Sequence, residues 1–160
     1  MSVPEFFLKR WEAEQPAFAR VLRALPGDQL HYTPHERSTK AGNLAWQLVL
    51  EQQGLAEIVR TGEMDWPTAP RPESLDEIVA AWEKATSDLR QGLEGFDETK
   101  AAAPAVMKMG GAAVWTDTVG EMLWGFLLDM IHHRGQLSTY LRPMGGKVPA
   151  IYGPSADSES

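Results

Sequence analysis

The chain has 160 residues, 43% of them hydrophobic and 23% charged, which is the balance of a single globular domain with a core of its own. Its formal net charge is −7 and no basic stripe offsets the acidic side chains, so binding of nucleic acid through phosphate contacts is disfavoured. The absence of cysteine excludes disulfides, thiolate metal ligands and cysteine nucleophiles. With neither a signal-peptide pattern nor an apolar run of membrane-spanning length, we expect a cytoplasmic protein without membrane contact.

Two helices are predicted in the first 61 residues. Apolar residues at helical spacing indicate the first helix over residues 3–25, with Pro16 inside it. Proline removes a backbone hydrogen bond and crowds the preceding turn, so we expect it to kink or split this helix. The second helix is predicted over residues 38–61, with Ser38 as its capping residue.

The second half of the chain predicts two further helices. A proline-rich connection leads to a helix over residues 74–94, which opens with the Ser-x-x-Glu capping box of Ser74. Apolar runs on either side of two glycines then indicate two short strands over residues 105–109 and 112–115. The last helix, over residues 117–143, is apolar on nearly every side, so we expect neighbours to cover it all round.

One polar group stands out in this last helix. Asp129, His132 and His133 lie within an otherwise apolar run, and residues three and four apart share a helix face. A buried carboxylate is costly unless it is paired or bound to a metal. From the residues alone, adjacent histidines are more often structural than ligating, and a metal site is the less common interpretation.

A second polar group lies in the predicted second helix, where Gln47 and Glu51 are four residues apart. Four amphipathic helices of this length predict one all-α domain over residues 1–160, an antiparallel four-helix bundle, with a loosely ordered tail from about residue 153. Such bundles build metal sites from side chains on facing helices. Imidazole and carboxylate ligands suit zinc, nickel, iron or manganese.

Several segments of the chain resemble a known family. The run His-His-Arg-Gly-Gln-Leu at residues 132–137, followed by Tyr-Leu-Arg at 140–142 and a glycine, is similar to the signature helix of the DinB-like superfamily. Residues 148–157 resemble the closing motif of one branch, and Leu-Ala-Trp at 44–46 precedes the position of the first family ligand. The resemblance spans essentially the whole chain. It implies a four-helix bundle, commonly a homodimer, that holds a divalent metal with three side chains.

The resemblance places the three ligand positions at Gln47, Asp129 and His133, with Glu51 and His132 as additional candidates. The family usually has histidine where this chain has Gln47 and Asp129, and only His133 is the expected residue. An aspartate at the second position resembles the maleylpyruvate-isomerase-like branch. An amide is a poorer ligand than imidazole, so we expect zinc or nickel to be bound weakly or to be absent from the purified protein.

Two functions from different classes follow. In the first, the chain is a metal-dependent enzyme resembling DinB-like hydrolases or thiol S-transferases, acting on a small-molecule substrate. In the second, it is a bundle that has lost its metal and binds a small molecule or forms a structural dimer, with Gln47, Asp129 and His133 joined by hydrogen bonds. The resemblance favours the first function, and the two ligand substitutions favour the second.

Overall fold

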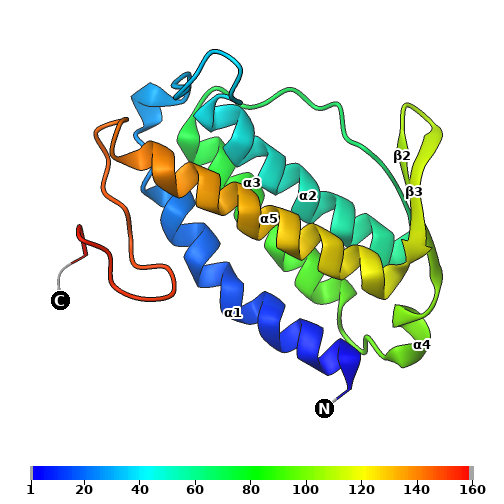
Figure 1. Cartoon of the computed structure of the whole chain (residues 1–160). Coiled ribbons are helices and arrows are strands. Elements are labelled where there is room, and N and C mark those ends of the chain that lie inside the picture. Colours follow the sequence, from blue (N-terminus) through cyan, green and yellow to red (C-terminus); the bar gives the residue numbers. More distant parts are fainter. Residues whose placement is uncertain (1, 159–160) are drawn as a thin grey trace.

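Four long helices lie side by side and make up most of the molecule in the computed structural model, which describes residues 2–158 (Figure 1). They are α1 (Val3–Arg23), α2 (Ala41–Thr61), α3 (Leu75–Gly92) and α5 (Val119–Leu141). The helix α2 packs against both α3 and α5, and α1 packs against the same two. A 3-10 turn, η1 (Gly27–Gln29), and a one-turn helix, α4 (Glu98–Ala101), lie in the connections. The fold is mostly helical, as the sequence predicted.

The helix α1 runs through Pro16 without a break, so of the two effects expected of this proline, a kink or a split, the split is absent. A capping box between Ser2 and Glu5 fixes its start. Gln15 directly precedes the proline, and its side-chain amide donates a hydrogen bond of 3.0 Å to the carbonyl of Trp11, one turn earlier. Trp11 is fully buried, so packing of this turn against the core outweighs the hydrogen bond that the proline cannot make.

Two helix starts differ from the expectation. The helix α2 begins at Ala41, and Lys40 precedes it without a side-chain cap; Ser38 lies in the turn before. Carbonyls of the preceding loop take over the role of a capping side chain, because Tyr32 and Leu30 accept hydrogen bonds from the first two amides of α2. The helix α5 was predicted from residue 117, with Asp117 or Thr116 as its cap, and is capped instead by Thr118. The capping box predicted at Ser74 is present and opens α3.

A three-stranded sheet in the order β1-β2-β3 lies at one end of the helices, with β2 and β3 visible as a hairpin (Figure 1). The strands are β1 (Glu63–Asp65), β2 (Pro104–Met109) and β3 (Ala112–Thr118). Gly110 and Gly111 both have positive φ, which a two-residue turn between twisted strands requires. The sequence predicted β2 and β3 but missed β1, which pairs in parallel with β2, because three residues are too few to show an alternating pattern.

The helix α5 is less enclosed than the sequence predicted. It packs mainly against α2 and α1, and it leaves Leu128 61% exposed, with His132 also on the surface. The expectation of neighbours all round was wrong, because an apolar composition does not show how many helices are available to cover it. None of the helices among residues 2–158 combines the length and apolarity needed to cross a membrane.

A buried ion pair ties α5 to α1. Arg134 and Glu14 are each only 2% exposed, and a nitrogen of the guanidinium lies 2.6 Å from a carboxylate oxygen. Tyr152, in the segment after α5, donates a hydrogen bond to the same carboxylate and accepts one from the arginine. Farther along, Asp157 accepts hydrogen bonds from Arg142 and from the backbone of Val148. These contacts hold residues 148–157 against the helices, and the last part of the tail, residues 159 and 160, lies outside the described residues.

We expect Glu14→Gln to lower the free energy of unfolding by about 3–5 kcal/mol, because it leaves the Arg134 charge buried without a counter-charge. Arg10 also pairs with Glu14, but its side chain is 48% exposed, so Arg10→Ala is the matched control and should cost less than about 1 kcal/mol. Urea denaturation at neutral pH measures both. Equal losses in the two variants would contradict this account of the buried pair.

Candidate metal centre

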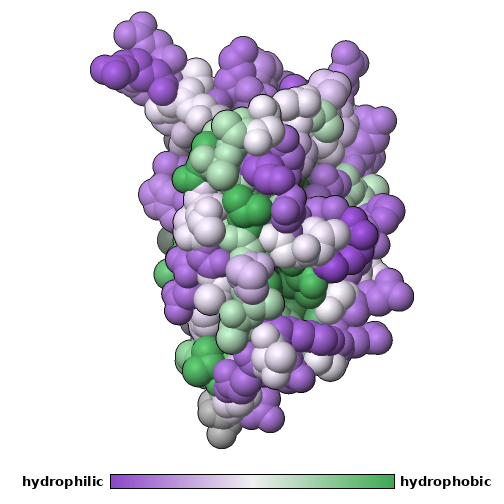
Figure 2. Space-filling view, turned by 90° about the vertical axis from the view of Figure 1, so that its right-hand side faces the viewer, coloured by the Kyte–Doolittle hydropathy of each residue, from purple (hydrophilic) through white to green (hydrophobic). Residues whose placement is uncertain are grey.

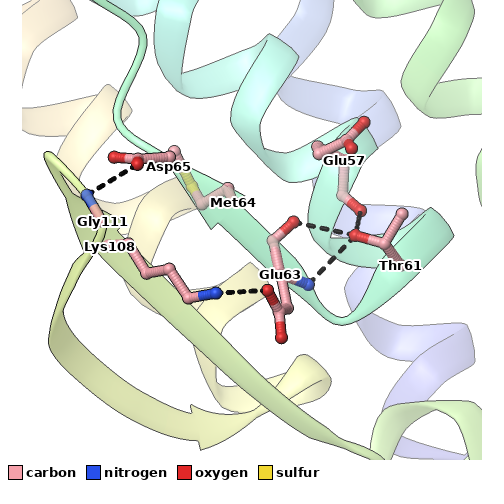
Figure 3. Close-up of a pocket in the computed structure, with 7 residues that line it drawn as sticks. All are labelled: Glu57, Thr61, Glu63, Met64, Asp65, Lys108 and Gly111. Atoms are coloured by element: carbon pink, nitrogen blue, oxygen red, sulfur yellow. Dashed lines mark hydrogen bonds and ion pairs between the residues drawn. The ribbon is translucent and has the colours of Figure 1, made fainter.

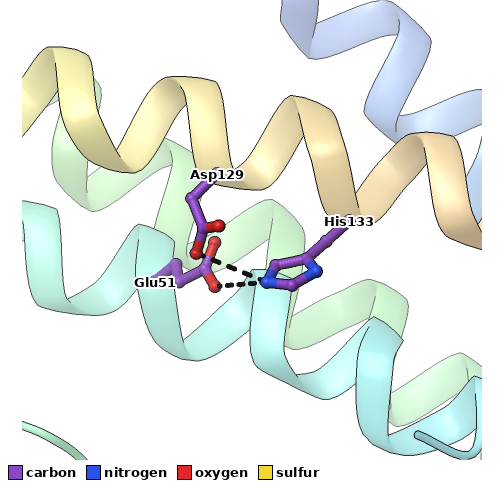
Figure 4. Close-up of side chains that lie close together, drawn as sticks. All are labelled: Glu51, Asp129 and His133. Atoms are coloured by element: carbon purple, nitrogen blue, oxygen red, sulfur yellow. Dashed lines mark ion pairs between the residues drawn. The ribbon is translucent and has the colours of Figure 1, made fainter. Parts of the chain in front are cut away.

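Two facing helices supply one cluster of polar side chains. The helix α2 carries Gln47 and Glu51 one turn apart, and α5 carries Asp129 and His133 one turn apart. A ligand atom from each of Glu51, Asp129 and His133 lies within 4.8 Å of the other two (Figure 4). The three side chains converge on one point between the helices, which is the spacing that coordination of a single ion requires.

Glu51 is the buried carboxylate of this cluster, with an exposed fraction of 0%. Its Oε1 accepts a hydrogen bond of 2.9 Å from the amide of Gln47, but its Oε2 has no partner among the described residues. Burial raises the pKa of Glu51 to about 8; the Gln47 hydrogen bond opposes this rise, and the nearby carboxylate of Asp129 adds to it. A buried carboxylate oxygen without a partner is the unusual feature of the site.

A hydrogen bond to Nδ1, on the side of the ring away from the cluster, orients His133. Its Nδ1 lies 2.8 Å from Oε1 of Gln136, one turn along α5, so the amide oxygen favours the tautomer with the proton on Nδ1. The lone pair on Nε2 then points into the cluster. Nε2 lies 3.3 Å from an oxygen of Asp129 and 3.7 Å from Oε1 of Glu51. This is the arrangement of a histidine prepared to ligate a metal.

The amide nitrogen of Gln47 lies between the two helices. It is 2.9 Å from Oε1 of Glu51 and 2.7 Å from Nε2 of His133, so its two protons serve both acceptors. An amide nitrogen has no lone pair to offer a metal. For Gln47 to ligate, the amide has to turn so that its oxygen faces the cluster.

The position of Asp129 corrects the sequence analysis. Its side chain is 52% exposed, so it is Glu51, and not Asp129, that experiences the cost of burial. Asp129 lies at the edge of the open face of α5, beside Leu128, whereas α2 is covered by both α3 and α5 at the level of Glu51. The predicted convergence of Gln47, Asp129 and His133 is nevertheless present in the structure.

The two additional candidates have different positions. Glu51 belongs to the cluster, and its spacing of four from Gln47 was the signal for it in the sequence. His132 is exposed, and its ring centroid lies 5.3 Å from that of His133, outside the group of converging ligand atoms. Adjacent residues on a helix point about 100° apart, so both histidines cannot face α2.

A hollow with a volume of about 500 Å³ lies beside β1 and is lined by several charged groups (Figure 3). Its charges already have partners: Lys108 lies 2.5 Å from Glu63, and Asp65 accepts a hydrogen bond of 2.8 Å from the backbone of Gly111. These contacts fasten β1 to the hairpin. The charged groups of this hollow therefore hold β1 against the hairpin, and the candidate functional site is the cluster between α2 and α5.

The helices, the hairpin and the polar cluster together characterise a class of small helical proteins, and comparison with known proteins identifies it. The model of the DinB family matches residues 1–159, so the chain belongs to the DinB family. That family assignment agrees with the resemblance found in the sequence, and the Glu51, Asp129 and His133 cluster is compatible with metal binding.

Individual relatives are more distant. An uncharacterized protein of Bacillus subtilis (strain 168), YrdA, is 24% identical over 157 residues, covering 96% of this chain and 90% of that protein. A DinB-like protein from Bacillus cereus ATCC 10987 superposes with a TM-score of 0.75 at 19% identity, covering 92% of this chain and 97% of that one. A DinB-like protein from Bacillus subtilis, YjoA, superposes with a TM-score of 0.68 at 18% identity, covering 99% of both chains. At these identities the two structures establish the fold alone.

We expect Glu51→Gln to make stability less sensitive to pH. The folded pKa of Glu51 is about 8 and the ordinary value is 4.5, so the stability linked to its proton is present below pH 4.5 and is lost as pH rises through 8. Between pH 6 and 9 the parent should lose about 2–3 kcal/mol relative to the variant, at about 1.4 kcal/mol per pKa unit.

The measurement is urea denaturation at both pH values in the presence of a chelator. Glu57→Gln is the control, because Glu57 is on the same helix and its side chain is 46% exposed. A parent and a Glu51→Gln variant that lose the same stability between pH 6 and 9 would contradict the burial argument.

Proposed function

We propose that this chain binds a divalent metal ion through Glu51, Asp129 and His133, and that the ion serves an enzymatic reaction of the hydrolase or thiol S-transferase kind on a small molecule. The observation that carries the proposal is the buried Oε2 of Glu51, which has no partner although it lies beside an imidazole nitrogen and a second carboxylate. One nitrogen and two oxygen donors suit zinc or nickel. We assign the four long helices to the DinB-type four-helix bundle, in which facing helices present these donors.

The residues fit a metal in number and in type. Three protein ligands leave a further coordination position for a reacting group, as catalytic sites require. A bound ion would act as a Lewis acid, polarising a substrate carbonyl or lowering the pKa of a water or thiol. Asp129 is half-exposed, so the cluster is accessible from the surface on the α5 side.

Three further properties of the side chains determine how an ion would bind. Gln136 holds the imidazole of His133 in the tautomer whose Nε2 can ligate. Glu51 loses its proton when an ion binds, since a ligating carboxylate is ionised and its pKa without metal is about 8. Gln47 has to turn its amide or leave the centre of the cluster. These two requirements make binding weaker than at a site of three histidines, and the proton that Glu51 has to lose makes it weaker at low pH.

The placement of Gln47 supports a second function. Its amide bridges Glu51 and His133 without any ion, so the cluster has a hydrogen-bonded state of its own. In this alternative, the chain is a non-catalytic bundle that binds a small molecule. Metal affinity distinguishes the two functions directly.

We expect calorimetric titration of protein without an affinity tag to show weak binding of zinc or nickel, at about one ion per chain. Glu51→Gln keeps the side-chain shape and His133→Ala removes the imidazole, and each should weaken binding at least about tenfold, since residues that only support ligands are already worth this much. His132→Ala, the neighbouring exposed histidine, is the control and should leave the affinity unchanged. Equal losses at His132 and His133 would indicate binding elsewhere.

We expect Gln47→His to tighten binding about tenfold or more, because it exchanges an amide nitrogen that cannot ligate for an imidazole that can. The same titration measures it, with Asn43→His, one turn earlier on α2, as the control for adding a histidine. If the parent and Gln47→His both fail to bind either metal, the enzymatic proposal is wrong and the binding-module alternative replaces it.

A further inference from the structure

A cavity of about 450 Å³ lies against α5 on the hairpin side of the polar cluster. Its walls come from five different elements: α2, the loop after β1, strands β2 and β3, and α5. The large apolar side chains that line it are Trp66, Met107, Met109, Trp115 and Phe126. Gln47 and Asp129 also line it, so the cavity is continuous with the cluster between α2 and α5. Its volume lies within the range of small-molecule sites.

The hairpin packs directly against α5 beside this cavity. Trp115 of β3 lies over Gly125 of α5, so closely that an added Cβ at Gly125 would lie only 2.5 Å from the indole ring. The same indole contacts Phe126, with ring centroids 5.6 Å apart. The aromatic wall therefore depends on a glycine in the middle of a helix, where glycine is otherwise unfavourable.

The lining favours one kind of ligand. Two indoles and two thioethers offer a flat, polarisable surface that suits a ring and adapts to its shape. Among residues 2–158, Asp129 is the only charged residue that lines the cavity, and neither lysine nor arginine is part of the lining. An anionic ligand would find no counter-charge there, whereas a cation would find a carboxylate and aromatic faces.

The surface around the cavity agrees with this preference. Figure 2 views the molecule from the side of the hairpin and shows hydrophobic patches set among hydrophilic side chains. Met109, at the end of β2, is 52% exposed, so part of the apolar wall is open to solvent while Met107 and Phe126 are buried. The chain as a whole carries a net charge of −7, which also disfavours anions.

We propose that this cavity binds an arylalkylamine: the aromatic ring lies between Trp66, Trp115 and the two methionines, and the ammonium group faces Asp129. This inference goes beyond the proposed function and does not rest on it. Asp129 pairs with the ammonium group only while it is not coordinated to an ion, so the amine and the metal are alternative occupants of this end of the cavity.

The test is calorimetric titration of the metal-free full chain, with a chelator present, using tryptamine and indole-3-propionate. The two probes share a ring and an arm and differ in the sign of the terminal charge. We expect tryptamine to bind at least about tenfold more tightly than indole-3-propionate, and butylamine, which has no ring, to give no measurable binding. Absence of tryptamine binding, or equal binding of the two indoles, would overturn the proposal.

Variants locate the site. Met109→Trp adds volume at a half-exposed position of the cavity wall and should weaken tryptamine binding about tenfold without unfolding the chain. Asp129→Asn should abolish the preference for tryptamine over indole-3-propionate while both still bind through the ring. Leu128→Ala is the control, because Leu128 is exposed on the same helix and does not line the cavity. Unchanged binding in Met109→Trp would overturn the assigned location.

The two proposals fail separately. Loss of tryptamine binding together with intact zinc binding would overturn the proposed ligand class and leave the metal proposal standing. Tryptamine binding in a chain that binds no metal would support the cavity and reject the enzymatic reaction.

Discussion

The burial of one carboxylate, Glu51, is the constraint on which the rest of the site depends. At an exposed fraction of 0%, this group either keeps its proton or needs a cation beside it. The geometry is compatible with either state. Without an ion, the amide of Gln47 donates a hydrogen bond to Glu51; with an ion, Asp129 and His133 of α5 supply two further donors. The facing of α2 and α5 thus produces a cluster with two states that differ in a proton and in the direction of one amide.

The hairpin supplies what the helices alone do not. Helices α2 and α5 bring polar groups together, but the apolar surface beside them comes from β2, β3 and the loop after β1. β1 is short, yet its parallel pairing with β2 anchors the whole sheet to the end of α2. Polar chemistry and apolar recognition are therefore carried by separate elements that meet along α5.

Helical periodicity and capping residues were enough to predict the four long helices to within a few residues, and glycine pairs were enough for β2 and β3. The pairing of positions 47 and 51 with 129 and 133 followed from helical spacing together with the family resemblance. Burial did not follow, because the sequence does not show how many neighbours cover a given turn. Asp129 was therefore taken for the buried carboxylate, when α5 has an open side there and α2 at Glu51 has none.

The pairing of Arg134 with Glu14 also bears on how the chain folds. The two residues are 120 positions apart, so their contact closes a loop that contains the whole of α2, α3 and the sheet. Loop closure of this length is entropically costly and rewards the chain only when both helices are in place. We therefore expect this contact to form only after the folding barrier has been crossed. On that expectation, weakening it speeds unfolding and leaves the refolding rate nearly unchanged, so that the ion pair determines the lifetime of the folded state.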